Sequence, residues 1–415
     1  MRRKIHVTEI RLGMYIDELC GSWMDHPFWK SSFKLSESRD LLALQRSSVR
    51  EVWIDTLRGL DVERPVNDGA DDADDAESSV EAEPDVEEAL RQVAAEKSPE
   101  PKVGLEEELQ RARQIQARAR TAVMEMFTEV RMGNALATTE LDGLVDEIDR
   151  SVSRNTAALI SLARLKDKDD YTYLHSVAVC ALMLALGRQL GLPAELNQSL
   201  GMAGLLHDVG KMVIPEDVLN KPGRLTDAEF DIIRTHPERG WEVLVKSGVT
   251  DEIVLDVCRH HHERVDGMGY PAKLSGDALT LYARMGAVCD VYDAVTSNRC
   301  YKEGWAPAEA LRKMASWQDG HFDERIFKAF VKTVGIYPVG TMVRLRSGRL
   351  AVVMGQSAGG LLLPVVKVFF SARSKAPIPL QQIDLSTMGD AVESLEDPVK
   401  WGLDITHLTG LTPRA

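Results

Sequence analysis

The stretch GMAGLLHDVGK, residues 201–211, ends an apolar helix with the adjacent pair His207–Asp208. Neighbouring helical residues point about 100° apart, so such a pair cannot easily chelate one ion from the middle of a helix. The two side chains can each address one ion, or the carboxylate can bridge two ions. The adjacent pair His261–His262 repeats this geometry further along the chain. Two such pairs predict two metal ions that lie close together.

Histidines are concentrated in the same part of the chain. A single histidine on a helix is usually an ordinary core or surface residue, but six with adjacent carboxylates are not well explained that way. A centre of histidine and carboxylate ligands suits iron, manganese or similar ions. Two such ions can clamp a phosphodiester and generate hydroxide at neutral pH. Six of the ten histidines fall within a quarter of the chain: His175, His207, His236, His260, His261 and His262.

A helical pattern begins near residue 103 and continues for more than 200 residues. Thr226 with Glu229 fits a capping box, and Pro237 suits the first turn of a helix. Small and apolar residues recur at spacings of three and four between residues 112 and 130, as on a heptad seam. This seam fits either a homodimer helix or packing of the helix against its own domain.

Both ends of the chain predict β structure. After Gly335 the hydrophobic period shifts towards two, so residues 338–415 predict a small β-rich segment. Residues 1–66 predict a small α+β accessory domain, and a packing role is favoured for it over ligand sensing. We expect its core to be supplied by Trp23, Phe28, Trp29, Phe33 and Trp53.

Much of the net charge of −14 lies in one acidic stretch. Residues 67–100 hold thirteen Asp or Glu against Arg91 and Lys97, with few large apolar groups. Such a composition cannot bury enough surface to fold, so residues 67–102 predict a disordered linker. The rest of the chain is nearly neutral, so the acidic net charge of the whole chain is no evidence against a phosphate-bearing ligand. No basic tract predicts binding to DNA or RNA.

The chain also lacks the usual marks of membrane insertion and secretion. No run of about 18 apolar residues is present, so we expect no membrane-spanning helix. The basic start, MRRKIHVTEI, has no apolar stretch or small-residue cleavage site. The five cysteines form no CxxC pair, which favours reduced thiols over a disulfide framework. We therefore expect a cytoplasmic protein.

HDVGK (207–211), followed by HHERVDGMGYP (261–271), resembles the HD-GYP subgroup of the HD phosphohydrolases. The match continues through residues 217–240 and 283–302 and covers roughly residues 165–335. HD alone is an unspecific pair, but HHExxDGxGYP at this distance from HDxGK is highly specific. The resemblance implies an all-helical catalytic domain that hydrolyses cyclic di-GMP.

Carried over position by position, the resemblance also implies residue roles. Asp208 matches the carboxylate that bridges the metals, and Lys211 completes HDxGK and would face a substrate phosphate. Tyr270 belongs to the GYP loop at the mouth of the site, and Arg299 and Lys302 match residues that hold the other phosphate. The implied metal ligands are His175, His207, Asp208, His236, His261, His262 and Asp290. The alignment with the HHExxDGxGYP motif begins at His261 and assigns no role to His260.

One position departs from the family pattern. Some members hold a third metal with a glutamate four residues before the first ligand histidine, and this chain has Tyr171 there. A phenol is a poor substitute for a carboxylate on such ions. Asp169 or Asp170 could compensate only if the backbone shifted by one or two residues. We therefore expect two divalent ions, iron or manganese, and a third metal is doubtful.

Together these observations predict a mainly α protein. An all-helical HD-type catalytic domain (103–337) follows a small α+β N-terminal domain and precedes a small β C-terminal appendage. The expected function is hydrolysis of cyclic di-GMP to pGpG, and in a second round to GMP, by a metal-bridging hydroxide. Lys211 and a metal-bound water are alternative general acids.

Two other functions were weighed against hydrolysis of cyclic di-GMP. The first is a weakly catalytic cyclic di-GMP receptor that signals to protein partners through the GYP loop or the N-terminal domain. The intact ligand set argues against it. The second is an HD phosphohydrolase for a different nucleotide, and the complete GYP loop argues against that.

Overall fold

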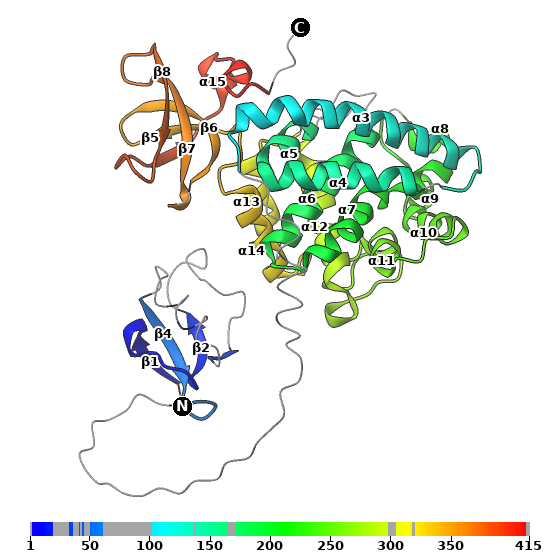
Figure 1. Ribbon diagram of the computed structural model, residues 1–415, viewed down its shortest axis with the longest axis horizontal. Helices are drawn as coiled ribbons and strands as arrows, with labels where there is room; N and C mark the ends of the chain where they lie inside the picture. Colours follow the sequence, from blue (N-terminus) through cyan, green and yellow to red (C-terminus); the bar gives the residue numbers. More distant parts are fainter. Residues whose placement is uncertain are drawn as a thin grey trace, which may run out of the picture. The chain divides into compact units, whose positions relative to one another are not determined.

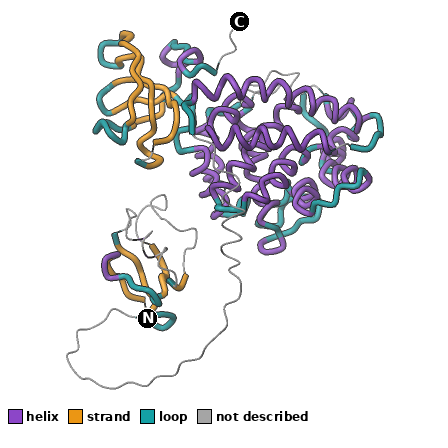
Figure 2. The backbone as a smooth tube through the Cα atoms, viewed as in Figure 1, coloured by secondary structure: helices purple, strands orange, loops and turns teal. Residues whose placement is uncertain are grey.

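The chain divides into two compact units, Met1–Ser98 and Pro99–Ala415, which Figure 1 colours along the sequence. In Figure 2, the regular structure drawn for the first unit consists mainly of strands, and helices dominate the second unit. Most of the predicted linker lies outside the described residues. The computed structural model describes residues 2–19, 33–35, 41, 44, 50–60, 102–136, 138–164, 171–221, 223–297, 304–317, 320–357 and 359–411.

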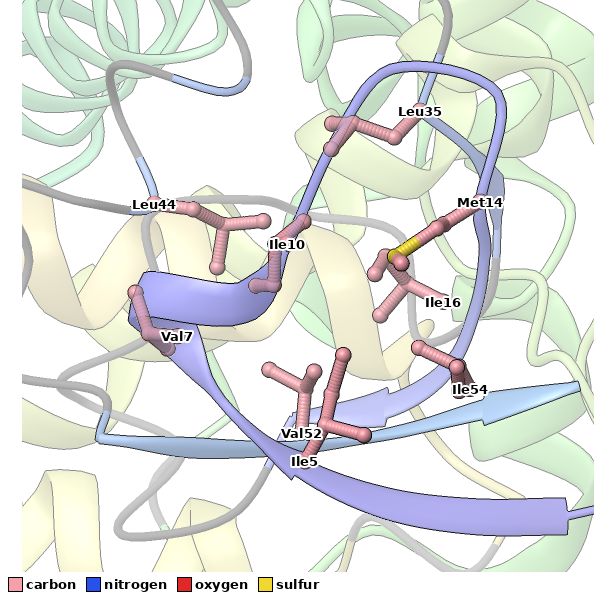
Figure 3. Close-up of a cluster of buried hydrophobic side chains, with 9 residues drawn as sticks. All are labelled: Ile5, Val7, Ile10, Met14, Ile16, Leu35, Leu44, Val52 and Ile54. Atoms are coloured by element: carbon pink, nitrogen blue, oxygen red, sulfur yellow. The ribbon is translucent and has the colours of Figure 1, made fainter. Parts of the chain in front are cut away.

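The first unit contains a small antiparallel sheet. Its strands lie in the order β1 (Arg2–His6), β4 (Glu51–Asp55), β2 (Tyr15–Leu19) and β3 (Phe33–Lys34). Successive side chains of a strand point to opposite faces, and in β4 this alternation buries Val52 and Ile54. Figure 3 shows the aliphatic core that these two residues share with Ile5, Val7, Ile10, Met14, Ile16, Leu35 and Leu44.

The prediction of an aromatic core for this unit is wrong for Trp53. Trp53 lies between Val52 and Ile54 in β4, so the alternation turns it to the opposite face, where it is only half-buried. The Arg2 guanidinium lies 5.2 Å from the centre of its ring. Trp23, Phe28 and Trp29 lie outside the described residues, and the Phe33 side chain is not described.

The second unit is built mainly of helices, as predicted. No helix among its described residues is both long enough and apolar enough to cross a membrane. In chain order the helices of the bundle are α3 (Leu105–Arg131), α4 (Thr139–Arg154), α5 (Thr156–Arg164), α6 (Tyr171–Gln189), α7 (Asn197–Leu206), α8 (Glu216–Leu219), α9 (Asp227–Ile233), α10 (His236–Lys246), α11 (Glu252–His260), α12 (Leu281–Thr296), α13 (Pro307–Ser316) and α14 (Glu324–Val334).

Helix α6 forms the centre of the bundle. It is buried continuously from residue 174 to residue 187 and packs against α5, α7 and α12. Gly204 of α7 allows the closest approach, because a Cβ at this position would lie 2.7 Å from the Cα of Cys180 in α6. This contact brings the end of α7, where the His207–Asp208 pair stands, beside α6.

The predicted helix starts near the site are confirmed. The Thr226 hydroxyl accepts the Glu229 amide at 3.3 Å, and the Glu229 carboxylate accepts the Thr226 amide at 2.7 Å, which completes the capping box of α9. Pro237 lies in the first turn of α10. The capping box satisfies amide groups that would otherwise lack partners at the helix end, and a proline at the start of α10 leaves no amide hydrogen to satisfy.

The apolar seam of α3 packs inside its own unit. Ala112, Ile115, Ala119, Met126 and Val130 are buried, and α3 contacts α4, α5 and α6. Of the two alternatives that the heptad-like spacing left open, the described contacts correspond to packing of the helix within its own unit.

A buried ion pair joins α3 to α4. The Glu108 side chain is fully buried; it accepts a hydrogen bond from Arg154 Nε at 2.7 Å and another from Ser151 Oγ at 2.8 Å. Burial opposes ionisation of this carboxyl, but Arg154 and Ser151 outweigh it and lower the pKa of Glu108. Glu108 is therefore a charged link inside the bundle.

The C-terminal part of the unit is an antiparallel sheet, as predicted. The strands, in the order β8 (Ala376–Asp384), β7 (Gly360–Ser371), β6 (Arg349–Ser357), β5 (Met342–Leu345) and β9 (Val392–Leu395), are followed by the short helix α15 (Pro398–Trp401). Hydrogen bonds attach the sheet to the bundle. Gln356 Nε2 donates to the Thr333 carbonyl at 3.0 Å, and Lys367 Nζ to Glu106 at 2.8 Å.

Candidate metal centre

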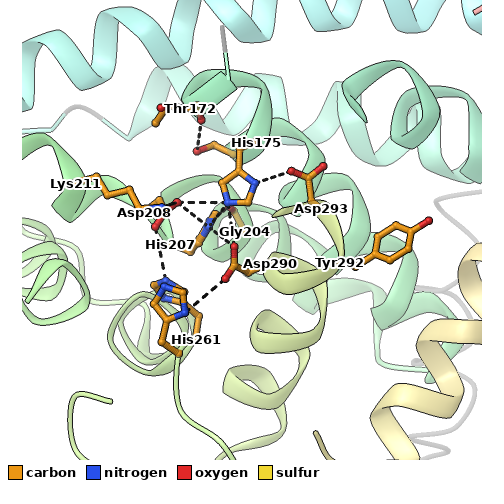
Figure 4. Close-up of polar contacts among 12 residues, drawn as sticks. Thr172, His175, Gly204, His207, Asp208, Lys211, His261, Asp290, Tyr292 and Asp293 are labelled. Carbon is orange, nitrogen blue, oxygen red and sulfur yellow. Dashed lines mark hydrogen bonds and ion pairs between the residues drawn. The ribbon is translucent and has the colours of Figure 1, made fainter. Parts of the chain in front are cut away.

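Several helix ends meet at one buried cluster of histidines and carboxylates. His175 lies in the second turn of α6, and His207 and Asp208 follow the last residue of α7. Figure 4 shows their side chains pointing toward one another. His236 opens α10, His261 and His262 follow α11, and Asp290 lies within α12. The fold thus brings together all seven residues predicted as ligands.

The two oxygens of Asp208 face two different pairs of histidines. Its Oδ2 lies 3.4 Å from His175 Nε2 and 3.3 Å from His207 Nε2. Its Oδ1 lies 3.2 Å from His236 Nε2 and 3.7 Å from His261 Nε2. Asp208 is 1% exposed, so these contacts are shielded from bulk solvent. A carboxylate in this position can join two neighbouring ions.

Within each pair the imidazole nitrogens also converge. His175 Nε2 and His207 Nε2 are 3.2 Å apart, and His236 Nε2 and His261 Nε2 are 3.3 Å apart. Two unprotonated nitrogens at this distance repel each other unless a proton or a cation lies nearby. Oδ1 of Asp208 is buried and has no hydrogen-bond donor among the described residues. These atoms fit a bound cation.

Backbone carbonyls fix which nitrogen of each ring faces the cluster. His207 Nδ1 lies 2.7 Å from the Gly204 carbonyl, and His236 Nδ1 lies 2.8 Å from the Ile233 carbonyl. His261 Nδ1 lies 3.0 Å from the Cys258 carbonyl. Each carbonyl accepts a hydrogen bond from Nδ1–H, which leaves the Nε2 lone pair free to bind a metal.

His175 is oriented by a carboxylate in place of a carbonyl. Its Nδ1 lies 2.6 Å from Oδ2 of Asp293, which is 3% exposed. A carboxylate behind a ligand histidine holds the ring and increases its basicity. We did not predict Asp293 from the sequence. A signal was present, because Asp293 lies three residues after Asp290 and therefore on the same face of α12.

Asp290 closes the cluster on the side of α12. Its Oδ1 lies 3.0 Å from His175 Nε2, and its Oδ2 lies 3.6 Å from His262 Nδ1.

Two sets of side chains could each hold an ion, and they share Asp208. The first set is His175, His207 and Asp208, and the second is Asp208, His236, His261 and His262. Divalent metals bind well to such nitrogen and oxygen donors.

The charges of the cluster are distributed unevenly. Burial works against ionisation of Asp208, but Lys211 and the neighbouring histidines outweigh it and hold its pKa well below the ordinary value. Burial alone would lower the pKa of His175, but hydrogen bonds to Asp208, Asp290 and Asp293 raise it to about 10. Burial lowers the pKa of His236 to about 4. Without a metal, His175 is therefore cationic and His236 neutral at neutral pH, beside ionised carboxylates, and a metal ion would replace the proton of His175.

Lys211 lies at the edge of the cluster. It follows Asp208 by three residues in the short 3-10 helix η4 (Val209–Val213), and its Nζ contacts Asp208 Oδ2. Its side chain is 23% exposed, so it can reach both the buried carboxylate and the solvent side. Arg299 and Lys302, the other two predicted phosphate-binding residues, lie outside the described residues.

The GYP loop folds back over His262. The Tyr270 amide donates to the His262 carbonyl at 3.2 Å, and the two rings are 4.7 Å apart between centres. The buried carboxylate of Glu263 accepts the Ala272 amide at 2.6 Å. Gly269 fits under this turn because a Cβ would lie 2.5 Å from the Cα of Glu263. These contacts hold Tyr270 beside the cluster.

Three further residues near the cluster complete its description. The Arg234 guanidinium lies 4.9 Å from the centre of the Tyr270 ring. We did not predict Arg234 from the sequence, although it stands two residues before His236. His260 lies apart from both ligand sets and pairs with Asp256 at 2.8 Å. Tyr171 is the first residue of α6, and its side chain is not described.

A helical bundle with these inward-facing histidines and aspartates defines a metal-binding protein of the HD class. The comparisons agree with this class. A family model described as "HD domain" matches residues 149–326, and one described as "Domain of unknown function (DUF3391)" matches residues 2–141. The second match runs across the acidic stretch and into α4.

Two relatives and one solved structure illustrate the similarity. The chain is 52% identical to the cyclic di-GMP phosphodiesterase PA4108 of Pseudomonas aeruginosa, over 97% of this chain and 94% of that protein. It is 36% identical to the cyclic di-GMP phosphodiesterase response regulator RpfG of Xanthomonas campestris pv. campestris, over 45% of this chain and 50% of that protein. Bd1817, an HDG"Y"P protein from Bdellovibrio bacteriovorus, matches 80% of this chain and 99% of its own, at 18% identity and a TM-score of 0.46.

The chain belongs to the HD-GYP family of HD-domain phosphohydrolases, which confirms the resemblance seen in its motifs.

Proposed function

We propose that this protein is a metal-dependent phosphodiesterase that hydrolyses cyclic di-GMP to pGpG, and in a second round to GMP. The observation that carries the proposal is Asp208, whose two oxygens face separate histidine pairs in a buried cluster of the bundle. The relative that covers nearly the whole chain is named a cyclic di-GMP phosphodiesterase, which supports the same substrate.

The proposed cofactor is a pair of divalent ions, iron or manganese. His175, His207 and Asp290 would hold one ion; His236, His261 and His262 would hold the other; and Asp208 would bind both. When bound, such ions polarise a phosphodiester and generate a nucleophile from water at neutral pH. The absence of cysteine from both ligand sets favours these metals over the thiolate sites of structural zinc.

The chain itself contributes position and charge around the substrate. Lys211 would hold a phosphate oxygen, and its ammonium group is one candidate donor of a proton to the leaving 3′-oxygen. Tyr270 and Arg234 form a flat, partly exposed edge next to His262, suited to stacking against a base. Arg299 and Lys302 would bind the second phosphate, a role that rests on the family motif.

A turnover assay on anaerobically purified protein, with metal analysis of the same sample, tests the proposal. We expect about two ions per chain and conversion of cyclic di-GMP to pGpG in the presence of manganese or ferrous iron. Binding of cyclic di-GMP without turnover would instead identify a receptor. Turnover of another cyclic dinucleotide in preference to cyclic di-GMP would contradict the proposed substrate.

The proposal extends to location and partners. Cys180, Cys258 and Cys289 are buried free thiols, which is consistent with the reducing cytoplasm. Met268, at the tip of the GYP loop, is 74% exposed and could contact other signalling proteins. The proposed partners also include a second copy of this chain, in a homodimer. Size-exclusion chromatography with light scattering, and pull-down with a Met268→Asp variant as control, would test these two partners.

A further inference from the structure

A cavity of about 560 Å³ lies in the second unit, between the helical bundle and the C-terminal sheet. Its walls come from the start of α5, the ends of α6 and α14, and strand β6. None of the proposed metal ligands lines it. Its volume falls within the range of about 300–1,000 Å³ that is usual for sites of small molecules.

The cavity is strongly basic. Among the described residues that line it there is no aspartate or glutamate, although the chain as a whole carries a net charge of −14. Two of its cations have carboxylate partners elsewhere: Arg154 pairs with Glu108 at 2.7 Å and Arg188 with Asp149 at 2.6 Å. The five cations that line it are Lys102, Arg154, Arg164, Arg188 and Lys332.

Two of these cations are held partly out of solvent. Arg164 is half-buried and donates to the Val339 carbonyl at 3.4 Å. Lys332 is half-buried near the end of α14, and burial together with nearby Lys328 lowers its pKa. Several like charges around a partly buried space repel one another, so an anion placed among them is stabilised by all of them.

The walls of the cavity are held together before any ligand arrives. Gln356 of β6 donates to the carbonyls of Lys332 and Thr333 at 3.3 and 3.0 Å, and Arg164 ties α5 to the start of the sheet. Binding to such a prearranged site avoids the cost of ordering its walls. The lining also includes apolar side chains, such as Ile160, which suit an organic part of a ligand.

The cavity and the metal centre lie on different sides of α12. Tyr292 lines the cavity, whereas the next residue, Asp293, reaches His175 in the metal centre. Figure 4 shows the Tyr292 ring pointing away from the cluster. A ligand in the cavity would therefore be separate from a substrate bound at the metals.

We propose that this cavity is a second ligand site, which binds a phosphate-bearing molecule of about the size of a mononucleotide. The phosphate would lie among Arg164, Lys332 and Lys102, and arginine in particular matches phosphate with paired hydrogen bonds. The site does not depend on the proposed activity, because no residue of the metal centre takes part in it.

Calorimetric titration of the full-length protein with guanosine 5′-monophosphate tests the site. Lys332→Gln removes one charge from the cavity and should weaken binding at least about tenfold, as expected for a lost hydrogen bond to a charged group. Lys313→Gln is the control: it makes the same change at a lysine of α13 that does not line the cavity, and it should retain the wild-type affinity. Both variants should melt and turn over substrate like the wild type.

A second variant fills the space directly. A Cβ added to Gly355, which lines the cavity from β6, would meet no atom within 4 Å, so a large side chain has room to enter. Gly355→Trp should therefore abolish binding of guanosine 5′-monophosphate while hydrolysis at the metal centre continues. Guanosine without phosphate should not bind to the wild type, and inorganic pyrophosphate should compete with the nucleotide.

Four results would overturn the proposal. The first is that guanosine 5′-monophosphate does not bind at about 1 mM. The second is that it binds equally to the wild type and to both cavity variants. The third is that binding is lost in Asp208→Ala, which would place the nucleotide at the metal centre. The fourth is binding of pyrophosphate without binding of the nucleotide, which would refute a ligand of nucleotide size.

Discussion

Asp208 joins the two halves of the proposed metal centre, because each of its oxygens faces its own pair of histidines. We expect Asp208→Ala to abolish hydrolysis of cyclic di-GMP while leaving the fold largely intact, since the shared anion that spaces the two ions is lost. Turnover measured beside circular dichroism checks this. Near wild-type turnover in the folded variant would contradict the assignment of two metals.

Asp293 is a positioning residue, since it acts on the metal only through His175. Removing such a partner usually costs about 10–100-fold in metal affinity or activity. We therefore expect Asp293→Asn to weaken metal binding by this amount, measured by competition with a chelator. Asp277→Asn makes the same change at a fully exposed position and should bind metal like the wild type. Equal affinities in the two variants would show that Asp293 does not orient a ligand.

Tyr171 precedes His175 by one helical turn, so the two positions lie on the same face of α6. A phenol with a reference pKa of about 10 offers mainly a neutral oxygen at neutral pH. Tyr171→Glu should therefore raise the metal content from two ions towards three per chain, whereas Tyr171→Phe should leave it at two. The measurement is the metal content per chain of the wild type and of both variants, after equal loading and desalting. Three tightly bound ions in the wild type would refute this reasoning.

Glu108 links α3 to α4 by a buried ion pair, and its removal would leave Arg154 without its main carboxylate partner. We expect Glu108→Gln to lower the free energy of unfolding at pH 7 by about 3 kcal/mol, as for other buried pairs that lose one partner. Glu107→Gln on the same helix is the control. Its carboxylate pairs with Arg111 in solvent, so its loss should cost less than about 1 kcal/mol.

The pH dependence of stability should change with Glu108 as well. Because its pKa is lower in the folded than in the unfolded state, the stabilisation is fully present above the unfolded value of about 4.3. This stabilisation is lost as the pH falls through the lower pKa that Glu108 has in the folded state. Urea unfolding between pH 7 and pH 3 should show a shallower acid loss in Glu108→Gln than in the wild type. Parallel curves would argue against a charged Glu108.

The acidic stretch, residues 67–100, is expected to be a spacer. A solvated linker orders nothing at the metal centre, so deletion of residues 67–100 should leave kcat and KM nearly unchanged. Steady-state kinetics of the deletion variant, with thermal melting to confirm folding, measures this. Lost activity in a folded deletion variant would show that the acidic stretch docks on the protein, for example as an inhibitory cover.

Local patterns in the chain were enough to predict the helical class and the two flanking β regions, whereas the residues that meet at the cluster were implied by the resemblance of the HD and GYP motifs to a known family. The physical reason is that capping boxes, hydrophobic periods and the HD and GYP motifs depend on residues close to one another in the sequence. The same local reasoning failed for Trp53, because the face that a strand buries depends on which side meets the core.

Contacts between distant residues were decided only by the tertiary structure. His175 and Asp293 are 118 positions apart, and packing of α6 against α12 brings them within 2.6 Å of each other. The basic cavity likewise needs α5, α14 and β6 to meet, and each of its cations is an ordinary surface residue when considered alone. The apolar seam of α3 was compatible with a homodimer and with packing inside its own unit, and only the observed burial distinguishes the two. Periodicity shows that a face is apolar, whereas only packing shows what covers it.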